Sequence, residues 1–332
     1  MNVGIIGTGT IAQAHAEAIH GCPELTLTAA CDTDQARLNA FCLQHKTRGF
    51  SDYRALLDSG VDIAAVTLPH ALHHPVGMDV CGHGCHLVME KPFAVTMDQC
   101  RELYRRAREK GVRVITADSA YHLPEVVHAK ELIRTRKLGR FISGSFINYK
   151  NYFTPGRPQW FLRPELAGGG QLINVGVHRI ALIRAMVGDG EISVKASVGF
   201  FQPHCSVEGN GSIFIGYQDG SAVLLEENGY YAGSKEQQSA CHFNFEQGIV
   251  NLGGKLSLVF RDGTVEYPKI PAQKGNSYLP VYRKLLSALA ENKQPYPSDR
   301  EGILDVRIIL AAYASAREGK EVRLDSPAWR FP

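Results

Sequence analysis

No stretch of this sequence approaches the ~20 consecutive apolar residues that a membrane-spanning helix needs. Net charge is also small, because 36 basic residues are interspersed with 33 acidic ones and leave a formal charge of +3. The chain therefore lacks the basic stripe that binds phosphate backbones, and we expect neither a nucleic acid nor a membrane as partner. No charged segment precedes the apolar strand that begins at Asn2, so we expect a cytoplasmic protein.

The composition is that of a folded globular protein, with 44% hydrophobic and 21% charged residues among 332. This length suits two domains, each with its own core. We expect the boundary near residue 120, with a first domain over residues 1–120 and a second, substrate-binding domain over residues 121–332.

Eight cysteines are scattered along the chain, and we expect them to be reduced thiols. Cys81, His83, Cys85 and His86 form a compact group of residue types that bind zinc. The alternative is a helix end, a glycine turn and a strand whose alternation separates the side chains. We favour this alternative and predict no metal site.

A short apolar run over residues 3–6 leads into a glycine-rich turn and then a helical pattern. Gly7 permits a tight turn, Gly9 allows the backbone to approach a pyrophosphate, and Ala12 lets the helix pack on the strand. The free N–H groups at the helix start would face the phosphates. The predicted phosphate loop comprises Gly7, Gly9, Thr10, Ile11 and Ala12.

A second apolar run, residues 25–31, ends at Asp32, which lies 20 residues after Ala12. This is the position of the acidic residue that binds the ribose hydroxyls in the dinucleotide fingerprint. A carboxylate there repels a ribose phosphate, and no arginine follows before Arg37, so we expect NAD rather than NADP. The alternative is an aspartate that caps a turn or helix.

Helical patterns and apolar strands continue to alternate through residue 117, which predicts a doubly wound parallel sheet. Thr96 and Gln99 have capping-box spacing at one helix start. Ligands of such sheets bind outside the carboxyl ends of the strands. The residues expected at this edge are Thr67, Pro69, His70, Glu90, Lys91 and Tyr121.

These motifs together resemble the family named after glucose–fructose oxidoreductase, inositol dehydrogenase and rhizopine catabolism. The resemblance covers nearly the whole chain. It rests on the glycine turn, residues 67–70 with His73 after them, Glu-Lys-Pro at residues 90–92, three glycines at 168–170 leading to His178, and the closing stretch 297–324.

The resemblance implies that Lys91 transfers a proton at a carbon-bound hydroxyl while the nicotinamide takes the hydride. It also implies that Glu90 contacts the cofactor ribose. A lysine is a poor base at its ordinary pKa of about 10.4, but burial and a cationic nicotinamide both lower that value. His70 and His73 are expected at the cofactor edge, whereas His15 is expected to pack in the first helix. A solvated ion pair is the alternative for Glu90 and Lys91.

The second half of the chain reads as long β-rich segments with hairpin turns. We expect an α/β domain with a large, mostly antiparallel open sheet. In the resembling family such a sheet commonly forms an oligomer interface, which implies a homodimer or homotetramer.

An apolar-periodic helix over residues 170–187 carries Asn174 and His178 four residues apart, hence on one face. The resembling family often has aspartate and histidine there, the histidine assisting proton transfer. Asn174 departs from that pattern, because an amide orients a hydroxyl but exchanges no proton near neutrality. A core histidine is the alternative for His178. Trp160 and Arg163 lie where the family covers the nicotinamide, with ordinary packing as the alternative.

The leading hypothesis is an NAD-dependent dehydrogenase or reductase for a small polar substrate, a sugar, sugar derivative or cyclitol. A second is a redox-neutral enzyme that oxidises and re-reduces the same sugar while a glycosidic group is eliminated. A third is a sugar or dinucleotide sensor without catalysis, which Asn174 keeps open.

Overall fold

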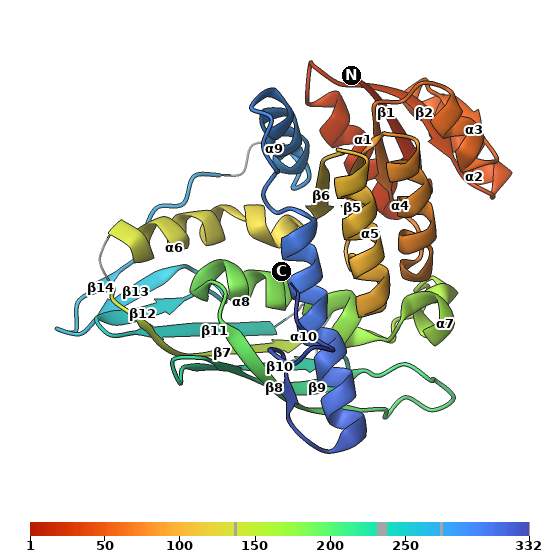
Figure 1. Ribbon diagram of the computed structural model, residues 1–332. Helices are drawn as coiled ribbons and strands as arrows, with labels where there is room; N and C mark the ends of the chain where they lie inside the picture. Colours follow the sequence, from red (N-terminus) through yellow and green to blue (C-terminus); the bar gives the residue numbers. More distant parts are fainter. Residues whose placement is uncertain (136–137, 231–237, 273–274, 332) are drawn as a thin grey trace. The chain divides into compact units, whose positions relative to one another are not determined.

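The computed structural model describes residues 1–135, 138–230, 238–272 and 275–331 (Figure 1). The chain divides into two units, Met1–His122 with Gln273–Ile303, and Leu123–Ala272 with Leu304–Pro332. The first division lies near the expected boundary at residue 120. From the sequence we expect the last helices, from Leu279 and from Ser298, to return and brace the boundary between the domains. Residues 273–303 belong to the first unit.

The first unit is a parallel α/β domain. Within the described residues its six strands have the order β3-β2-β1-β4-β5-β6, which is the order of dinucleotide-binding sheets. This arrangement is a Rossmann domain, and it confirms the doubly wound parallel sheet predicted for the first domain. The strands are β1 (Asn2–Ile6), β2 (Thr26–Cys31), β3 (Arg48–Phe50), β4 (Ile63–Val66), β5 (His86–Glu90) and β6 (Val114–Ala117). The helices are α1 (Thr10–His20), α2 (Gln35–His45), α3 (Tyr53–Asp58), α4 (His73–Gly82), α5 (Met97–Glu109) and α9 (Leu279–Ala290).

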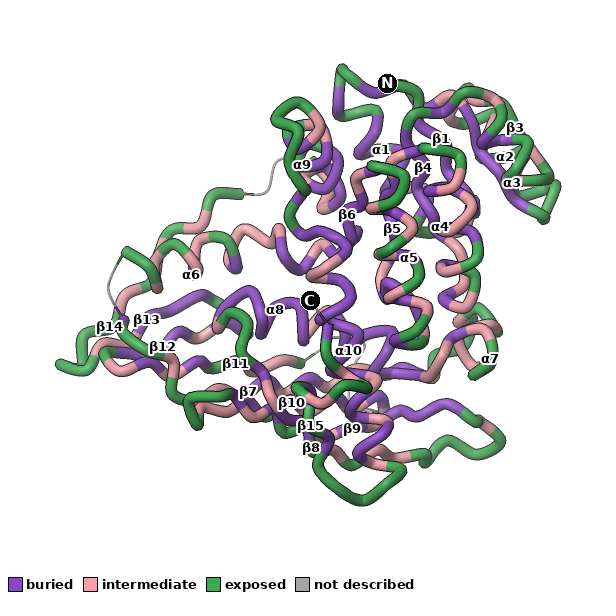
Figure 2. The backbone as a smooth tube through the Cα atoms, viewed as in Figure 1, coloured by how far each residue is buried: buried purple, intermediate pink, exposed green. Residues whose placement is uncertain are grey.

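Local sequence explains several of these boundaries. Strand β4 is buried at every position, as expected for a central strand covered on both faces (Figure 2). Helix α5 begins after Thr96, whose side chain accepts a hydrogen bond from the Gln99 N–H at 3.2 Å, as the capping spacing predicts. Helix α9 joins this unit because Leu279, Tyr282 and Leu285 are buried in the core cluster that contains β1 and α1 residues.

The second unit is built on a nine-stranded sheet in which every pairing is antiparallel except that of β7 with β10, within the described residues. The predicted mostly antiparallel sheet is confirmed. Its order is β14-β13-β12-β11-β7-β10-β9-β8-β15. The strands are β7 (Phe141–Tyr149), β8 (Glu191–Gly199), β9 (Asn210–Tyr217), β10 (Ala222–Asn228), β11 (Gln238–Phe245), β12 (Gly248–Asn251), β13 (Ser257–Phe260), β14 (Val265–Glu266) and β15 (Val322–Arg323).

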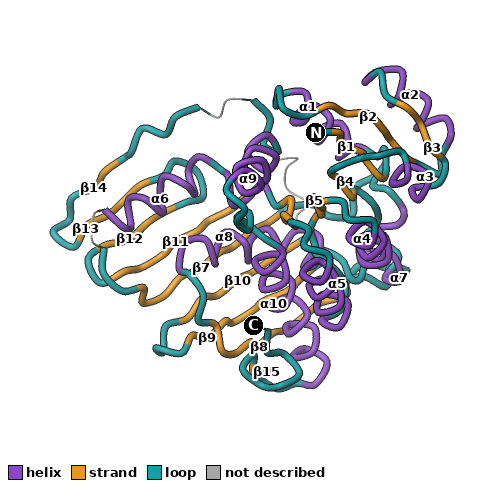
Figure 3. Tube along the Cα trace, turned by 45° about the horizontal axis from the view of Figure 1, so that its top comes forward, coloured by secondary structure: helices purple, strands orange, loops and turns teal. Residues whose placement is uncertain are grey.

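Helices cover one face of this sheet (Figure 3). Helix α8 (Val177–Val187) contacts β7, and α6 (Pro124–Thr135) contacts α8. A short helix, α7 (Pro164–Ala167), precedes α8. Three large apolar side chains on β7, β9 and β10 are exposed: Ile142 at 51%, Phe214 at 48% and Leu224 at 43%. This unit therefore has apolar side chains open to solvent.

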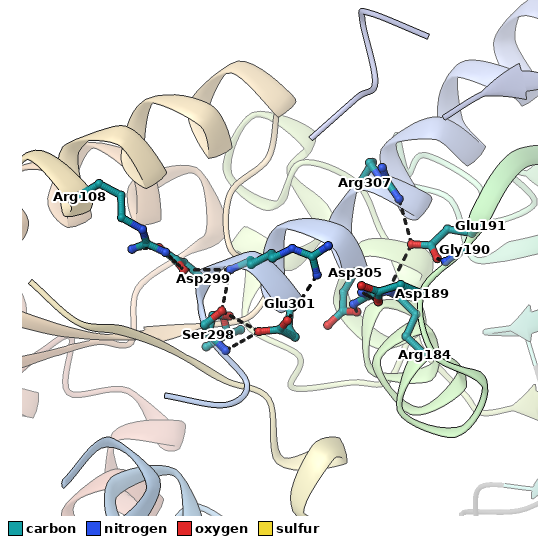
Figure 4. Close-up of polar contacts among 12 residues, drawn as sticks. Arg108, Arg184, Asp189, Gly190, Glu191, Ser298, Asp299, Glu301, Asp305 and Arg307 are labelled. Atoms are coloured by element: carbon teal, nitrogen blue, oxygen red, sulfur yellow. Dashed lines mark hydrogen bonds and ion pairs between the residues drawn. The ribbon is translucent and has the colours of Figure 1, made fainter. Parts of the chain in front are cut away.

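Helix α10 (Asp299–Glu318) is shared, because the division of the chain falls after Ile303. In the first unit Arg108 holds the fully buried Asp299 through two hydrogen bonds of 3.0 and 2.9 Å. In the second unit Asp305 accepts a hydrogen bond from the buried Arg184 at 2.8 Å (Figure 4). Each of the two parts of α10 is thus held within its own unit by a charged pair. Within the described residues, no helix has the length and apolar character needed to cross a bilayer.

Candidate active site

The turn after β1 contains the first two glycines of the predicted phosphate loop. Gly7 has a φ of 97°, and a Cβ there would lie 2.6 Å from the Thr67 carbonyl oxygen, so only glycine fits. Gly9 precedes α1 without any side-chain cap, and a Cβ on Gly9 would meet no atom within 4 Å. The missing side chain therefore serves no internal packing. A helix start without a side-chain cap is the kind of position where backbone N–H groups bind phosphate in dinucleotide folds.

The remaining residues of the predicted phosphate loop lie in the first turn of α1. Ala12 is fully buried against the strand, which explains the need for a small residue. Thr10 and Ile11 are exposed at the start of α1.

Asp32 follows β2 and faces this loop. Its Oδ2 accepts hydrogen bonds from the Thr8 N–H at 2.8 Å and the Thr8 hydroxyl at 2.9 Å. Arg37, on the first turn of α2, donates from Nε to Oδ2 at 3.0 Å and from Nη2 to Oδ1 at 2.9 Å. Burial alone raises the pKa of Asp32, but the hydrogen bonds from Arg37, Asp34 and Thr8 outweigh it and lower the pKa to about 2. The Asp32 side chain is therefore ionised. It pairs with Arg37, which the sequence analysis had treated as too far along the chain to matter.

The segment after β4 brings further predicted residues to the same sheet edge. The Thr67 hydroxyl donates to the Gly7 carbonyl oxygen at 2.6 Å and so links this segment to the glycine turn. Pro69 is partly exposed, and His70 is buried at 3% exposure. The ring nitrogens of His73 lie 2.7 Å from the Pro92 carbonyl oxygen and 2.9 Å from that of Leu68. His73 thus connects the segments after β4 and β5 through its buried ring.

Glu90, the last residue of β5, lies in a buried hydrogen-bond network. Its Oε1 is 3.0 Å from Nε2 of His15, a fully buried residue of α1. The Nδ1 atom of His15 is 2.8 Å from the Tyr282 hydroxyl, and the Tyr278 hydroxyl also hydrogen-bonds to Glu90. Because a carboxylate only accepts, His15 Nε2 carries the proton that it donates.

These partners keep Glu90 ionised. Burial raises its pKa, but the hydrogen bond and charge of His15, the charge of Lys91 and the Tyr278 hydroxyl lower it below the ordinary value. Lys91 follows directly and is only partly buried. A lysine next to a fixed carboxylate therefore stands at the carboxyl edge of the sheet.

The second unit holds the other predicted catalytic residues. Asn174 lies in a π-helical turn, η4 (Leu172–Gly176), that leads into α8, whereas the sequence predicted a uniform helix. Such turns are frequent at functional sites. The buried Asn174 donates from Nδ2 to the Tyr152 hydroxyl at 3.5 Å. His178 is partly exposed on the first turn of α8.

Trp160 and Arg163 lie in and after a short turn, η3 (Gln159–Leu162). Trp160 stacks on Phe161 with ring centroids 3.7 Å apart. Arg163 pairs with Glu165 at 2.7 Å, and its side chain is 60% exposed. Their expected contact with the cofactor stays a prediction.

The cysteine and histidine group does not converge on one point. Cys85 donates to the Val61 carbonyl oxygen at 3.2 Å, while His86 accepts from the Arg113 N–H at 3.1 Å. His83 contacts the Asp79 carbonyl oxygen at 2.8 Å, and Cys81 is buried within α4. In the part of the chain that the structure describes, no set of three potential ligands is arranged to hold a metal ion.

Sequence reasoning missed the contacts of His15, Tyr278 and Tyr282, and took His15 for simple packing. A lone histidine in an apolar helix gives no signal of its partner. Tyr282 lies 267 residues from His15, so no local pattern connects them.

A six-stranded parallel sheet in this order, with a glycine turn after β1 and a carboxylate after β2, is the fold of dinucleotide-binding domains. Comparison with known families agrees. Residues 1–118 match a model described as the oxidoreductase family with an NAD-binding Rossmann fold, and residues 126–251 match the GFO/IDH/MocA C-terminal domain. The chain belongs to the GFO/IDH/MocA oxidoreductase family, as its sequence motifs predicted.

Individual relatives are distant but extend over most of the chain. D-glucoside 3-dehydrogenase from Escherichia coli is 28% identical, over 98% of this chain and 97% of its own. A scyllo-inositol 2-dehydrogenase (NADP(+)) from Bacillus subtilis is 24% identical, over 87% of this chain and 88% of its own. The solved structure of levoglucosan dehydrogenase in complex with NADH and levoglucosan matches with a TM-score of 0.89 at 20% identity, over 98% of this chain and 100% of its own. This last likeness confirms the fold.

Proposed function

We propose that the protein transfers a hydride between a nicotinamide cofactor and a carbon-bound hydroxyl of a sugar, sugar derivative or cyclitol. The observation that carries the proposal is the fixed Glu90 carboxylate with Lys91 beside it, at the sheet edge that also holds the glycine loop. The named activities of the relatives, on inositol and on glucosides, support the same substrate class.

Each residue has a defined task in this proposal. In the oxidative direction Lys91 accepts the hydroxyl proton while the carbon-bound hydrogen leaves as hydride. A bound nicotinamide supplies the two-electron acceptor for that hydride. His178 assists the proton transfer, and Asn174 orients a substrate hydroxyl through its amide. In reduction Lys91 returns the proton to the carbonyl oxygen.

We also propose that NAD is the preferred cofactor, with Asp32 accepting hydrogen bonds from the adenosine ribose. The pairing of Arg37 with Asp32 weakens the discrimination against NADP, because the arginine neutralises part of the repulsion toward a ribose phosphate. The preference for NAD over NADP then depends on the hydrogen bonds that hold Arg37 to Asp32.

Replacement of Asp32 by alanine is expected to shift the NADH-to-NADPH affinity ratio toward NADPH by about 10- to 100-fold, the range for charged hydrogen bonds. The variant loses the ribose acceptor and releases Arg37 for a phosphate. Fluorescence titration with both cofactors measures the ratio. Asp34→Asn is the matched control, since Asp34 lies 3.8 Å from the same guanidinium but caps α2. Tighter binding of NADPH by the wild type would overturn the proposed preference.

We further propose a cytoplasmic homodimer or homotetramer that pairs through the nine-stranded sheet. The exposed Ile142, Phe214 and Leu224 support this, because Phe214 and Leu224 are direct neighbours on β9 and β10 and offer a shared apolar patch.

The experiment that tests the function is NADH absorbance with NAD⁺ and a panel of inositols, aldoses, glycosides and sugar acids. We expect net NADH formation with at least one class of polyol. Product release from a glycoside without net NADH would indicate the redox-neutral reaction instead. Cofactor binding without any turnover across the panel would indicate a sensor.

A further inference from the structure

Beside Asn174 the second unit holds a group of cations that the proposed reaction does not use. Tyr152 is fully buried, and its hydroxyl contacts Asn174. The Arg157 guanidinium lies over the Tyr152 ring, 3.9 Å from its centroid, and its Nε donates to the Tyr152 carbonyl oxygen. Arg157 is thus held one side chain away from Asn174.

Lys150 points to the same region. Its N–H donates to the Asn228 carbonyl oxygen at 2.8 Å and continues the ladder of β7 with β10 past Tyr149. Since side chains alternate along a strand, Lys150 lies on the same face as Asn148, whose amide donates to Glu227 at 2.7 Å. Lys150 is partly exposed and therefore open to a ligand.

A third cation, Arg179, follows His178 and lies with Nε 3.4 Å from Oε1 of Glu227. Burial lowers the pKa of Lys150, and the charges of Arg157 and Arg179 lower it further against the opposing charge of Glu227. Lys150 is therefore close enough to Arg157 and to Arg179 to be repelled by both.

No carboxylate forms an ion pair with Lys150 or Arg157 among the described residues. Glu227 is fully buried and is already bound by Arg179 and by the amides of Asn148 and Gln171. Glu208, which lies near Tyr152, is occupied by the N–H groups of Gly170 and Leu172 and by the Tyr313 hydroxyl.

We propose that the substrate carries an anionic group, a carboxylate or a phosphate, which Lys150 and Arg157 bind beside Asn174. This inference rests on the proposed function, because it narrows the polyol to an acidic sugar or cyclitol derivative. Partly desolvated cations that repel one another are costly without a counter-charge, and a bound anion supplies it. The polyol hydroxyls then lie toward Asn174 and His178.

The test compares matched pairs of compounds: aldoses with their aldonic and uronic acids, and inositol with an inositol phosphate. kcat and KM are measured for the wild type, Lys150→Gln and Lys150→Arg. Lys269→Gln is the control, as an exposed lysine of the same unit. We expect kcat/KM for an acid to exceed that for its neutral partner. We expect Lys150→Gln to lose about 10- to 100-fold for the acid alone, mostly in KM, and Lys150→Arg to restore most of it.

The acid and phosphate arms identify which anion is bound. Equal kcat/KM of the wild type for the neutral and acidic compounds of a pair would contradict the anion site without contradicting the proposed dehydrogenase activity. An equal effect of Lys150→Gln on kcat/KM for the two compounds would contradict it in the same way. If no compound is turned over, the proposed function fails and equilibrium binding decides this inference. Binding of the acid to the NADH-saturated protein is then measured for the wild type and both variants. Binding that is lost in Lys150→Gln and restored in Lys150→Arg supports the site. Binding that is unchanged in Lys150→Gln, or no binding to the wild type, overturns it.

Discussion

Replacement of Lys91 by alanine is expected to lower kcat by about 1000-fold, within the range that a positioned proton-transfer group contributes. The variant retains the glycine loop, Asp32 and Glu90, which bind the cofactor in this account, so NADH affinity should change by no more than a few-fold. Because Lys91 is only partly buried, thermal unfolding should stay near that of the wild type. Steady-state kinetics, NADH titration and calorimetry measure the three quantities.

Lys110→Ala is the matched control, since Lys110 is an exposed lysine at the end of α5 in the same unit. It should behave as wild type in all three measurements. If Lys91→Ala keeps more than a tenth of wild-type kcat, another group transfers the proton and the role given to Lys91 is wrong.

His15→Ala is expected to lower both stability and activity. His15 and Glu90 are a buried pair, and removal of one partner leaves an uncompensated carboxylate, at a cost of about 3 kcal/mol in the free energy of unfolding. With its hydrogen bond lost, the pKa of Glu90 should rise toward the value that burial favours. A neutral Glu90 no longer favours the charged form of Lys91, so the pH at which oxidation reaches half its maximal rate should fall.

Urea unfolding and the pH profile of kcat/KM test these effects separately. His15→Gln keeps an N–H donor and should recover part of both. His20→Ala is the control on the exposed end of the same helix, where the Nε2 atom of the ring lies 3.3 Å from Nδ1 of His45. If His15→Ala lowers the free energy of unfolding but leaves the pH profile unchanged, the role of His15 is structural only.

Much of the first unit could be predicted because its signals are local. A few neighbouring residues are enough to indicate the glycine turn, the spacing to Asp32 and the strand ends at Thr67 and Glu90. The parallel direction of the strands follows from the alternation of strands and helices. No expectation from the sequence covers β3 and α3, which have 3 and 6 residues and are too short to show a period.

The contacts made between distant segments could not be predicted in the same way. Helix α9 returns to the first unit and supplies Tyr278 and Tyr282 to the Glu90 network, which no periodicity indicates. Arg37 was discounted by its distance along the chain, although one helical turn brings its side chain back to Asp32. The charge balance around Lys150 likewise depends on β10 and α8, which are far apart in sequence.

The measurement that tests the central claim most directly is transfer of a deuterium label. A polyol substrate labelled at the carbinol carbon is incubated with NAD⁺ and the enzyme, and mass spectrometry follows the label. We predict one deuterium in the reduced nicotinamide for each substrate oxidised, and loss of this transfer in Lys91→Ala. Conversion of the polyol with the label retained on the carbon, or cofactor binding without any transfer across the panel, would contradict the account.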